Sequence, residues 1–166
     1  MAGDDHLIFE VKQKSFKVSA QSFFQVNSQQ AERLIDQVLE FIPQSGFRFL
    51  ELYSGVGLFT AFIAPRFQEI VAIEESESAC NDFAANLDQY DHISLYVGSM
   101  NAVLPGIDGK FDCVLLDPPR SGVDEWSMAA LLALKIPSLV YVSCDIATLA
   151  RDLKILMSAG YRLNEV

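Results

Sequence analysis

The chain has 166 residues, a length typical of one domain, and its 51% hydrophobic and 20% charged residues exclude a disordered chain. Its 12 basic and 22 acidic residues give a net charge of −10, which taken alone predicts weak binding to nucleic acid. No apolar run approaches the ~18 residues of a membrane-spanning helix, and the N-terminal residues lack the basic start and apolar core of a signal peptide.

The first half of the chain predicts a hairpin, a helix, and then strands that alternate with helices. Residues 7–19 form two short strand-like runs around a polar turn, as in a β-hairpin. Asn27 is a suitable N-cap for an amphipathic helix that ends at Pro43, with Gln30 as its capping-box partner. Beyond this helix we expect strands at 47–53, 69–75 and 92–98, and helices from Leu58 to about Pro65 and from Ser76 to about Gln89.

The second half continues the alternation. We expect strands at 111–117 and 137–143, a helix over 124–135, a helix that Asp145 caps and Gly160 ends, and the start of a sixth strand at 161–166. Alternating strands and helices predict an α/β fold, with a mostly parallel, doubly wound sheet covered on both faces. Ligands of such sheets bind beyond the carboxyl ends of the strands, so the strand ends are the first places to search.

The turn at 51–57, ELYSGVG, contains two glycines that let a backbone pass close to a ligand. The pattern is GxG without a following Lys-Ser/Thr, so a phosphate-binding loop is not indicated, and a tight turn without a ligand remains an alternative. Glu74 ends the next strand, where an acid can hold the two hydroxyls of a ribose. Glu75 beside it points to the opposite face. The two features favour a nucleoside-containing cofactor, S-adenosylmethionine rather than NAD.

Two later strand ends carry further reactive side chains. Asp117 precedes Pro118 and Pro119, which stiffen the loop and hold Asp117 at the mouth of the site; a rigid turn with a capping Asp is the alternative. Cys144 lies directly before a helix, where the positive end of the helix dipole favours the thiolate and the neighbouring Asp145 opposes it.

The remaining cysteines and the acidic residues favour ordinary structural roles. Cys80 and Cys113 fall within a helix and a strand and are interpreted as packed apolar residues. The absence of any CxxC pair argues against a metal site and a disulfide scaffold, and it favours a cytoplasmic location. Residues 67–109 contain eight acids and no Lys or Arg, and we interpret them as a solvated acidic face.

Several motifs, taken together and in this order, resemble the S-adenosylmethionine-dependent RNA uracil-5-methyltransferases. These motifs are FFQVN at 23–27, ELYSGVG at 51–57, DPPRSG at 117–122, VYVSCD at 140–145 and ATLARD at 147–152. The resemblance extends from about residue 7 to the end of the chain. The combination of the motifs is specific, whereas each motif alone is not.

By this resemblance, residues 1–166 form a single Rossmann-like class I methyltransferase domain, with a hairpin or linker at 7–20 and the core at 27–166. The implied cofactor is S-adenosylmethionine, with Glu74 on its ribose, and no metal is implied. The implied cofactor contacts are Gln25, Tyr53, Gly55, Gly57, Glu74 and Asp117. Cys144 matches the nucleophile of the family. The implied reaction methylates carbon 5 of a uridine in rRNA or tRNA through a covalent cysteine adduct.

The family's methyltransferase domain continues into a further strand and a glutamate that serves as general base, and no residue of this chain is assigned to that step. We therefore expect a core shortened before its last strand, with 137–143 as an open edge that 161–166 or a second copy, in a homodimer, covers. The family's RNA-binding barrel does not fit in this length, so we expect weak binding to an unpaired uridine. Two alternatives remain open: a cofactor-binding module that is inactive alone, and a methyltransferase for small molecules or proteins, which leaves Cys144 without a role.

Overall fold

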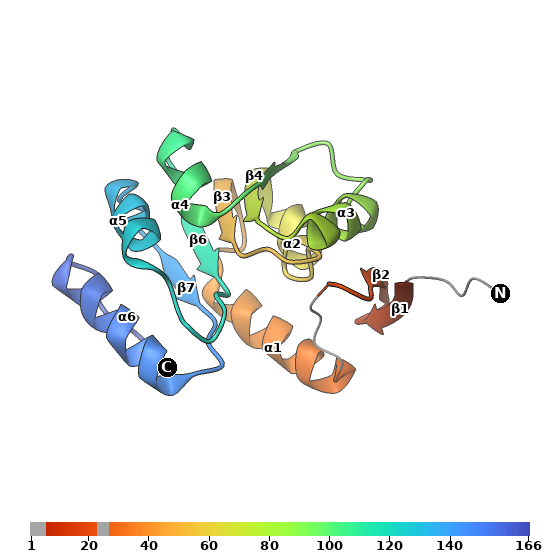
Figure 1. Cartoon of the computed structure of the whole chain (residues 1–166), viewed down its shortest axis with the longest axis horizontal. Helices are drawn as coiled ribbons and strands as arrows, with labels where there is room; N and C mark the ends of the chain where they lie inside the picture. The colour runs from red at the N-terminus through yellow and green to blue at the C-terminus, as the bar shows by residue number, and fades with distance from the viewer. Residues whose placement is uncertain (1–5, 23–26) are drawn as a thin grey trace.

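The computed structural model describes residues 6–22 and 27–166. Its centre is a parallel sheet in the order β5-β4-β3-β6-β7 (Figure 1). The strands of this sheet are β3 (Gly46–Leu52), β4 (Phe67–Glu74), β5 (Ile93–Val97), β6 (Cys113–Leu116) and β7 (Leu139–Tyr141). A separate antiparallel hairpin joins β1 (His6–Val11) to β2 (Lys14–Ser19). The predicted α/β fold with a parallel sheet and an N-terminal hairpin is confirmed.

Helices cover both faces of the sheet, as Figure 1 shows. The helices are α1 (Ser28–Phe41), α2 (Thr60–Ile63), α3 (Glu77–Asn86), α4 (Met100–Val103), α5 (Glu125–Ala133) and α6 (Ile146–Ser158). Two 3-10 turns, η1 (Ala64–Arg66) and η2 (Leu104–Gly106), continue α2 and α4. None of the helices within the described ranges is long and apolar enough to cross a membrane.

Neighbouring residues of the strands face opposite layers of the core. Phe49 packs with the hairpin, α1, α2 and α3, whereas Leu50 packs with α4, α5 and α6. A strand buried on both faces needs an almost continuous apolar run, because successive side chains alternate between the two layers. The sequence of β6, Cys-Val-Leu-Leu, is buried at each position and meets this requirement.

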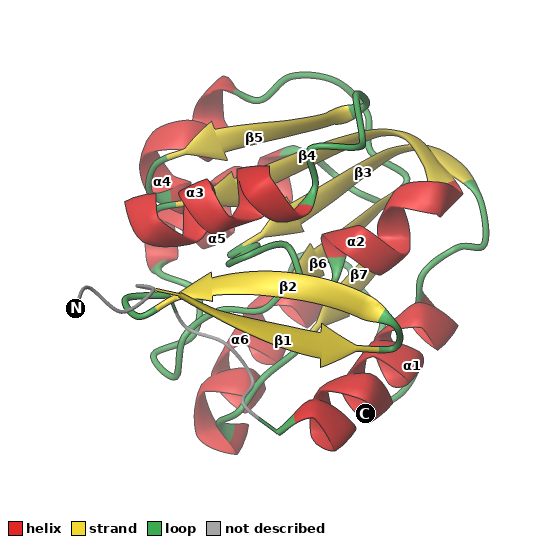
Figure 2. Cartoon of the chain, turned by 90° about the vertical axis from the view of Figure 1, so that its right-hand side faces the viewer, coloured by secondary structure: helices red, strands yellow, loops and turns green. Residues whose placement is uncertain are grey.

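Two side chains of α3 hold the β1–β2 hairpin against the rest of the domain. Figure 2 shows the hairpin beside α3. The buried Asp82 carboxylate accepts hydrogen bonds from the Ser19 amide at 2.7 Å and from the Ser22 hydroxyl at 2.6 Å. The Asn86 amide group bonds both backbone groups of Lys17 and also donates to the Val56 carbonyl at 3.0 Å. The hairpin is therefore tied through α3 to the glycine turn that follows β3.

Two sequence expectations differ from the structure. The sixth strand predicted at 161–166 is wrong, because this segment makes no ladder with β7 and instead begins with the Tyr161 hydroxyl donating to the Ile136 carbonyl at 2.7 Å. A strand needs a hydrogen-bonded neighbour. Residues 161–166 are instead separated from β7 and α6 by a cavity of about 260 Å³. The short helix α4 was not predicted, since its four residues are too few for a helical period to appear.

Glu51, on the central strand β3, is a carboxyl group inside the core. Only 1% of its surface is exposed, and it accepts a hydrogen bond of 2.7 Å from the Thr60 hydroxyl at the start of α2. Burial raises the pKa of Glu51 to about 8, the Thr60 hydrogen bond opposes part of that rise, and the nearby Asp117 charge adds to it. The fold therefore favours the protonated form of Glu51.

A carboxyl group whose folded pKa lies above its unfolded value contributes stability that is complete below about pH 4.5 and is lost as pH rises through 8. The loss is on the order of 1 kcal/mol per pH unit between these limits. We expect Glu51→Gln, which keeps an acceptor for Thr60 but does not titrate, to remove this dependence. Urea unfolding of both proteins between pH 5 and 8 measures the difference, and parallel stability profiles would contradict the assignment.

Candidate functional site

The carboxyl ends of four parallel strands bring the expected site residues to one edge of the sheet. Tyr53 follows β3, Glu74 ends β4, Asp117 follows β6 and Cys144 lies three residues after β7. The backbone ladder extends past the strands at each step. The Ser54 amide donates to the Ile73 carbonyl at 3.2 Å, the Asp117 amide to Leu52 at 3.4 Å, and the Val142 amide to Leu116 at 2.8 Å. The four side chains therefore start from the same end of four consecutive strands of the sheet.

The glycine turn after β3 is held against the end of β4. The Gly55 amide donates a hydrogen bond of 2.9 Å to the Glu74 carboxylate. Gly55 has φ +54° and nothing within 4 Å of the place where a Cβ would stand, so this side of the turn is open to a ligand. Gly57 has φ +84°, and a Cβ there would stand 2.6 Å from Leu87, the C-cap of α3, and 3.0 Å from Phe83 of α3. The first glycine leaves room for a ligand, and the second lets the turn pack on α3.

The Glu74 carboxylate is fixed by backbone donors. Besides Gly55, it accepts hydrogen bonds from the amides of Glu75 at 3.0 Å and Ser76 at 2.8 Å. Ser76 in turn caps α3 by accepting from the Ala79 amide. Carboxylate oxygens have about four acceptor sites, so one remains for hydroxyl donors of a ligand. Glu75 lies beyond the strand and is exposed, which favours Glu74 as the binding residue.

Tyr53 and Ser54 each have an unusual feature within this turn. Tyr53 has φ +62°, an unfavourable conformation for a bulky residue that occurs preferentially at functional sites. Burial, with the charges of Asp124 and Glu75, raises the pKa of Tyr53 to about 12, so its hydroxyl stays neutral. The Ser54 hydroxyl is buried without a hydrogen-bond partner among the described residues. Most buried polar groups are paired with protein, water or a ligand, so this hydroxyl is a candidate ligand contact. Ser54 was not among the residues predicted from the sequence, because a serine beside glycines is common in turns.

Asp117 is a half-buried acid at the start of the DPPR loop. Burial raises the pKa of Asp117 to about 6, which leaves it mostly ionised at neutral pH. The loop turns back at Pro119, whose carbonyl accepts a hydrogen bond of 2.8 Å from the Gly122 amide. An ionised carboxylate at this edge is suited to a cationic ligand.

Cys144 is exposed, whereas Cys80 and Cys113 are buried as the sequence predicts. Asp145 caps α6 by accepting a hydrogen bond of 2.9 Å from the Thr148 amide. That hydrogen bond, assisted by the Thr148 hydroxyl, lowers the pKa of Asp145, so the cap stays charged. The thiol is the one cysteine side chain that reaches solvent at the carboxyl edge of the sheet, and it is therefore accessible to a substrate.

The remaining expected contact, Gln25, lies outside the described residues. Ser22 before it is bonded to Asp82, and Asn27 after it caps α1 by accepting from the Gln30 amide at 3.2 Å. Within 6–22 and 27–166, no cluster of three His, Cys, Asp or Glu side chains could hold a metal ion.

The chain is similar in sequence to known RNA methyltransferases. Residues 4–165 match the tRNA (uracil-5-)-methyltransferase family. The chain is 34% identical over 172 residues to an uncharacterised RNA methyltransferase of Halalkalibacterium halodurans, and it spans 37% of that protein's length. A similar relative from Clostridium tetani is also 34% identical and is covered to the same extent.

Solved structures agree with this relationship. The tRNA (uracil-54, C5)-methyltransferase of Pyrococcus abyssi, solved with S-adenosyl-L-homocysteine, is 31% identical in sequence, with a TM-score of 0.82. The match covers 99% of this chain and 40% of the Pyrococcus abyssi chain. A precorrin 8W decarboxylase of Methanobacterium thermoautotrophicum, 18% identical with a TM-score of 0.70, shares the fold. The family match over residues 4–165, together with the structural match over 99% of the chain, establishes that this protein belongs to the tRNA (uracil-5-)-methyltransferase family.

Proposed function

We propose that this chain is a single domain that binds S-adenosylmethionine and transfers its methyl group to carbon 5 of a uridine in RNA, using Cys144 as a covalent nucleophile. One observation carries the proposal: the exposed Cys144 thiol lies at the same sheet edge as the glycine turn held by Glu74. Family membership and the S-adenosyl-L-homocysteine in the related Pyrococcus abyssi structure support it.

The residues of this edge fit the cofactor. The Glu74 carboxylate keeps one acceptor site for a ribose hydroxyl, and Gly55 leaves open space beside it. The unpaired Ser54 hydroxyl and the ionised Asp117 offer further polar contacts. We assign cofactor binding to these residues together with Gln25, Tyr53 and Gly57.

The cofactor supplies an electrophilic methyl group on a sulfonium. The Cys144 thiolate adds to carbon 6 of uracil, and the displaced electron pair makes carbon 5 nucleophilic. Carbon 5 takes the methyl group, a base then removes the carbon 5 proton, and the carbon–sulfur bond breaks to release Cys144. The exposed position of Cys144 gives an unpaired base access, which a base within a duplex has only after flipping.

The RNA itself is expected to bind weakly to this chain. The net charge of −10 opposes contact with phosphates, and the acids are concentrated between Phe67 and Gly109. We propose a uridine in a loop or unpaired segment of tRNA or rRNA, because such a base needs little energy to reach the thiol. A core that binds cofactor but requires other parts of a larger protein for catalysis is the second candidate, favoured by the chain's spanning 37% of its relatives.

Replacing Glu74 tests the cofactor site. Glu74→Ala should weaken S-adenosylmethionine binding by ~1–3 kcal/mol, because it removes a charge-assisted acceptor. Titration calorimetry measures the change, with the exposed Glu75→Ala as a matched control that should bind as the wild type does. The assignment fails if the wild type shows no binding at millimolar cofactor, or if NADH binds instead.

Replacing Cys144 tests the covalent step. Wild type incubated with S-adenosylmethionine and 5-fluorouridine-containing RNA should form an adduct that survives denaturing electrophoresis, since fluorine at carbon 5 blocks the final elimination. Cys144→Ser should keep cofactor binding and lose the adduct, while Cys80→Ala, at a buried cysteine, should retain it. Cofactor binding without an adduct in the wild type would favour the inactive-core candidate.

The free edge of β7 supports a proposal about assembly. β7 pairs with β6 alone among the described strands, and residues 161–166 leave its other side unpaired. Ser138 and Val142 bond to β6, so the alternate residues Leu139 and Tyr141 present their backbone groups to the open side. Unpaired edges act as templates for a further strand, and a symmetric homodimer joining two β7 edges would satisfy both.

A proline at the edge tests this assembly. Leu139→Pro removes an outward N–H without touching the β6 ladder and should convert a concentration-dependent dimer into a monomer, whereas Leu139→Ala should leave the dimer. Sedimentation velocity over a range of concentrations distinguishes them. A strictly monomeric wild type whose 138–143 amides exchange rapidly would contradict the proposal.

A further inference from the structure

A buried carboxylate on α6 joins three segments of the molecule. Asp152 has no exposed surface and accepts hydrogen bonds from the Val123 amide at 2.9 Å and from the Tyr141 hydroxyl at 2.6 Å. Val123 belongs to the loop between β6 and α5, and Tyr141 ends β7. Burial, together with the neighbouring Asp152, raises the pKa of Tyr141, so its hydroxyl remains a neutral donor.

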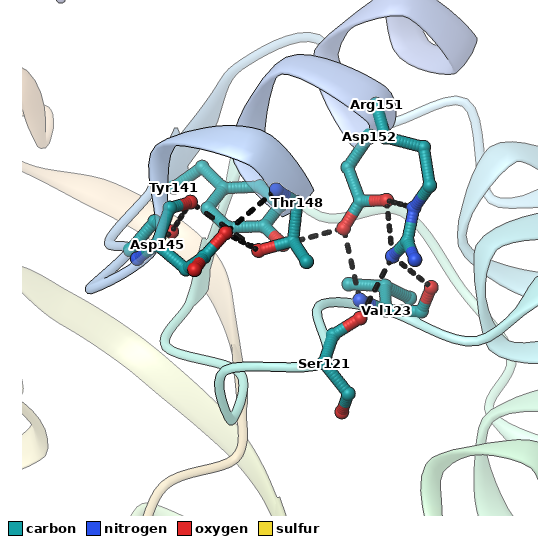
Figure 3. Close-up of polar contacts among 8 residues, drawn as sticks. Ser121, Val123, Tyr141, Asp145, Thr148, Arg151 and Asp152 are labelled. Atoms are coloured by element: carbon teal, nitrogen blue, oxygen red, sulfur yellow. Dashed lines mark hydrogen bonds and ion pairs between the residues drawn. The ribbon is translucent and has the colours of Figure 1, made fainter.

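Arg151 completes the contact from the exposed side (Figure 3). Its Nε donates to Asp152 Oδ1 at 2.8 Å, and its Nη2 donates to the carbonyls of Ser121 at 2.9 Å and Val123 at 3.2 Å. The guanidinium therefore neutralises the buried carboxylate while it holds the backbone of the loop. Two backbone carbonyls and one amide of residues 121–123 are bonded to these two side chains.

Gly122 makes this close approach possible. Its φ is +73°, and a Cβ at this position would stand 2.5 Å from both Arg151 Nη2 and Asp152 Oδ2. No side chain fits between the loop and α6, so the loop backbone lies directly on the charged pair. Such a contact has little freedom to slide.

The loop and the helix that these contacts join both begin at residues of the candidate site. The loop begins at Asp117, and Pro118 and Pro119 stiffen the stretch between Asp117 and the bonded residues. Helix α6 begins two residues after Cys144, and Asp145 between them caps the helix, so the position of the thiol depends on the position of the start of α6. A shift of the loop relative to α6 would therefore change the distance between Asp117 and Cys144.

We propose that Arg151 and Asp152 are positioning residues that set the placement of the Cys144 thiol relative to the Asp117 side of the cofactor site, through their grip on residues 121–123. The proposal rests on the function proposed above. Loss of these contacts should change the reaction rate as well as the stability, because misplacing reacting groups by about 1 Å can cost ~100-fold in rate.

The test uses a matched pair of Arg-to-Lys variants. Arg151→Lys keeps the charge but cannot bond the carboxylate and two carbonyls together. Arg48→Lys is the control, because Arg48 likewise bonds a carboxylate, Glu69 at 2.8 Å, and a loop carbonyl, that of Asp108, but does so at the start of β3. Asp152→Asn is a second variant that keeps the size of the buried group.

Three readouts separate positioning from stability. We expect Arg151→Lys and Asp152→Asn to slow formation of the Cys144 adduct with 5-fluorouridine-containing RNA about 10- to 100-fold. S-adenosyl-L-homocysteine affinity should stay within about threefold of wild type, a difference of less than 1 kcal/mol. Arg48→Lys should keep the wild-type adduct rate at a comparable loss of urea stability. An unchanged rate in both α6 variants, or an equal loss in Arg48→Lys, would overturn the proposal.

A measurement without catalysis keeps the proposal testable if the wild type forms no adduct. Nitroxide labels on Cys144 and on an introduced Ser121→Cys report the separation of the two segments by electron paramagnetic resonance. We expect a narrow distance distribution in the wild-type background and with Arg48→Lys, and a broad or shifted one with Arg151→Lys or Asp152→Asn. Identical distributions would show that these residues do not set the geometry, whereas a missing adduct with a broadened distribution would count against the proposed function alone.

Discussion

The parallel hydrogen bonding of β3 to both β4 and β6 is the constraint on which the remaining structure depends. Each of these ladders continues beyond the ends of the strands, through the Ser54 amide on one side and the Asp117 amide on the other. Parallel strands expose their last residues at the same edge, so a glycine turn, an acid and a proline-stiffened loop from distant parts of the sequence become neighbours. The Glu74 carboxylate holds the glycine turn against β4 by accepting from the Gly55 amide, and this hydrogen bond fixes the position of the carboxylate that we propose as the ribose-binding group.

Buried carboxyl groups link the loops to this frame. Asp82 fastens the hairpin to α3, and Asp152 fastens the loop after β6 to α6. Glu51 differs, because one hydroxyl donor compensates little of its burial and its pKa rises to about 8. The contrast follows from the number of donors: although burial opposes the change, hydrogen bonds from the Ser22 hydroxyl and from the Ser19 amide and hydroxyl lower the pKa of Asp82. A buried charge is tolerated where several donors replace water, and it is neutralised by a proton where they do not.

Part of the fold and part of the site were predictable from residues alone. The caps at Asn27 and Asp145 form as predicted, because a capping side chain bonds backbone groups two or three residues away. The burial of Cys80 and Cys113 and the exposure of Cys144 also follow from their places within or beyond an element. The strand predicted at 161–166 failed because strand formation depends on a distant partner, which a local pattern of apolar residues cannot supply.

By itself, then, the sequence determined the alternation of strands and helices, the turn chemistry at Gly55 and Gly57, and the order of the motifs that indicate the family. These properties depend on local backbone preference and on side-chain type. Only the tertiary structure decided that the Ser54 hydroxyl has no hydrogen-bond partner among residues 6–22 and 27–166, and that Arg151 and Asp152 hold residues 121–123. Hydrogen bonds between residues about 30 positions apart arise from the packing of β6, β7 and α6, and no spacing along the chain encodes them.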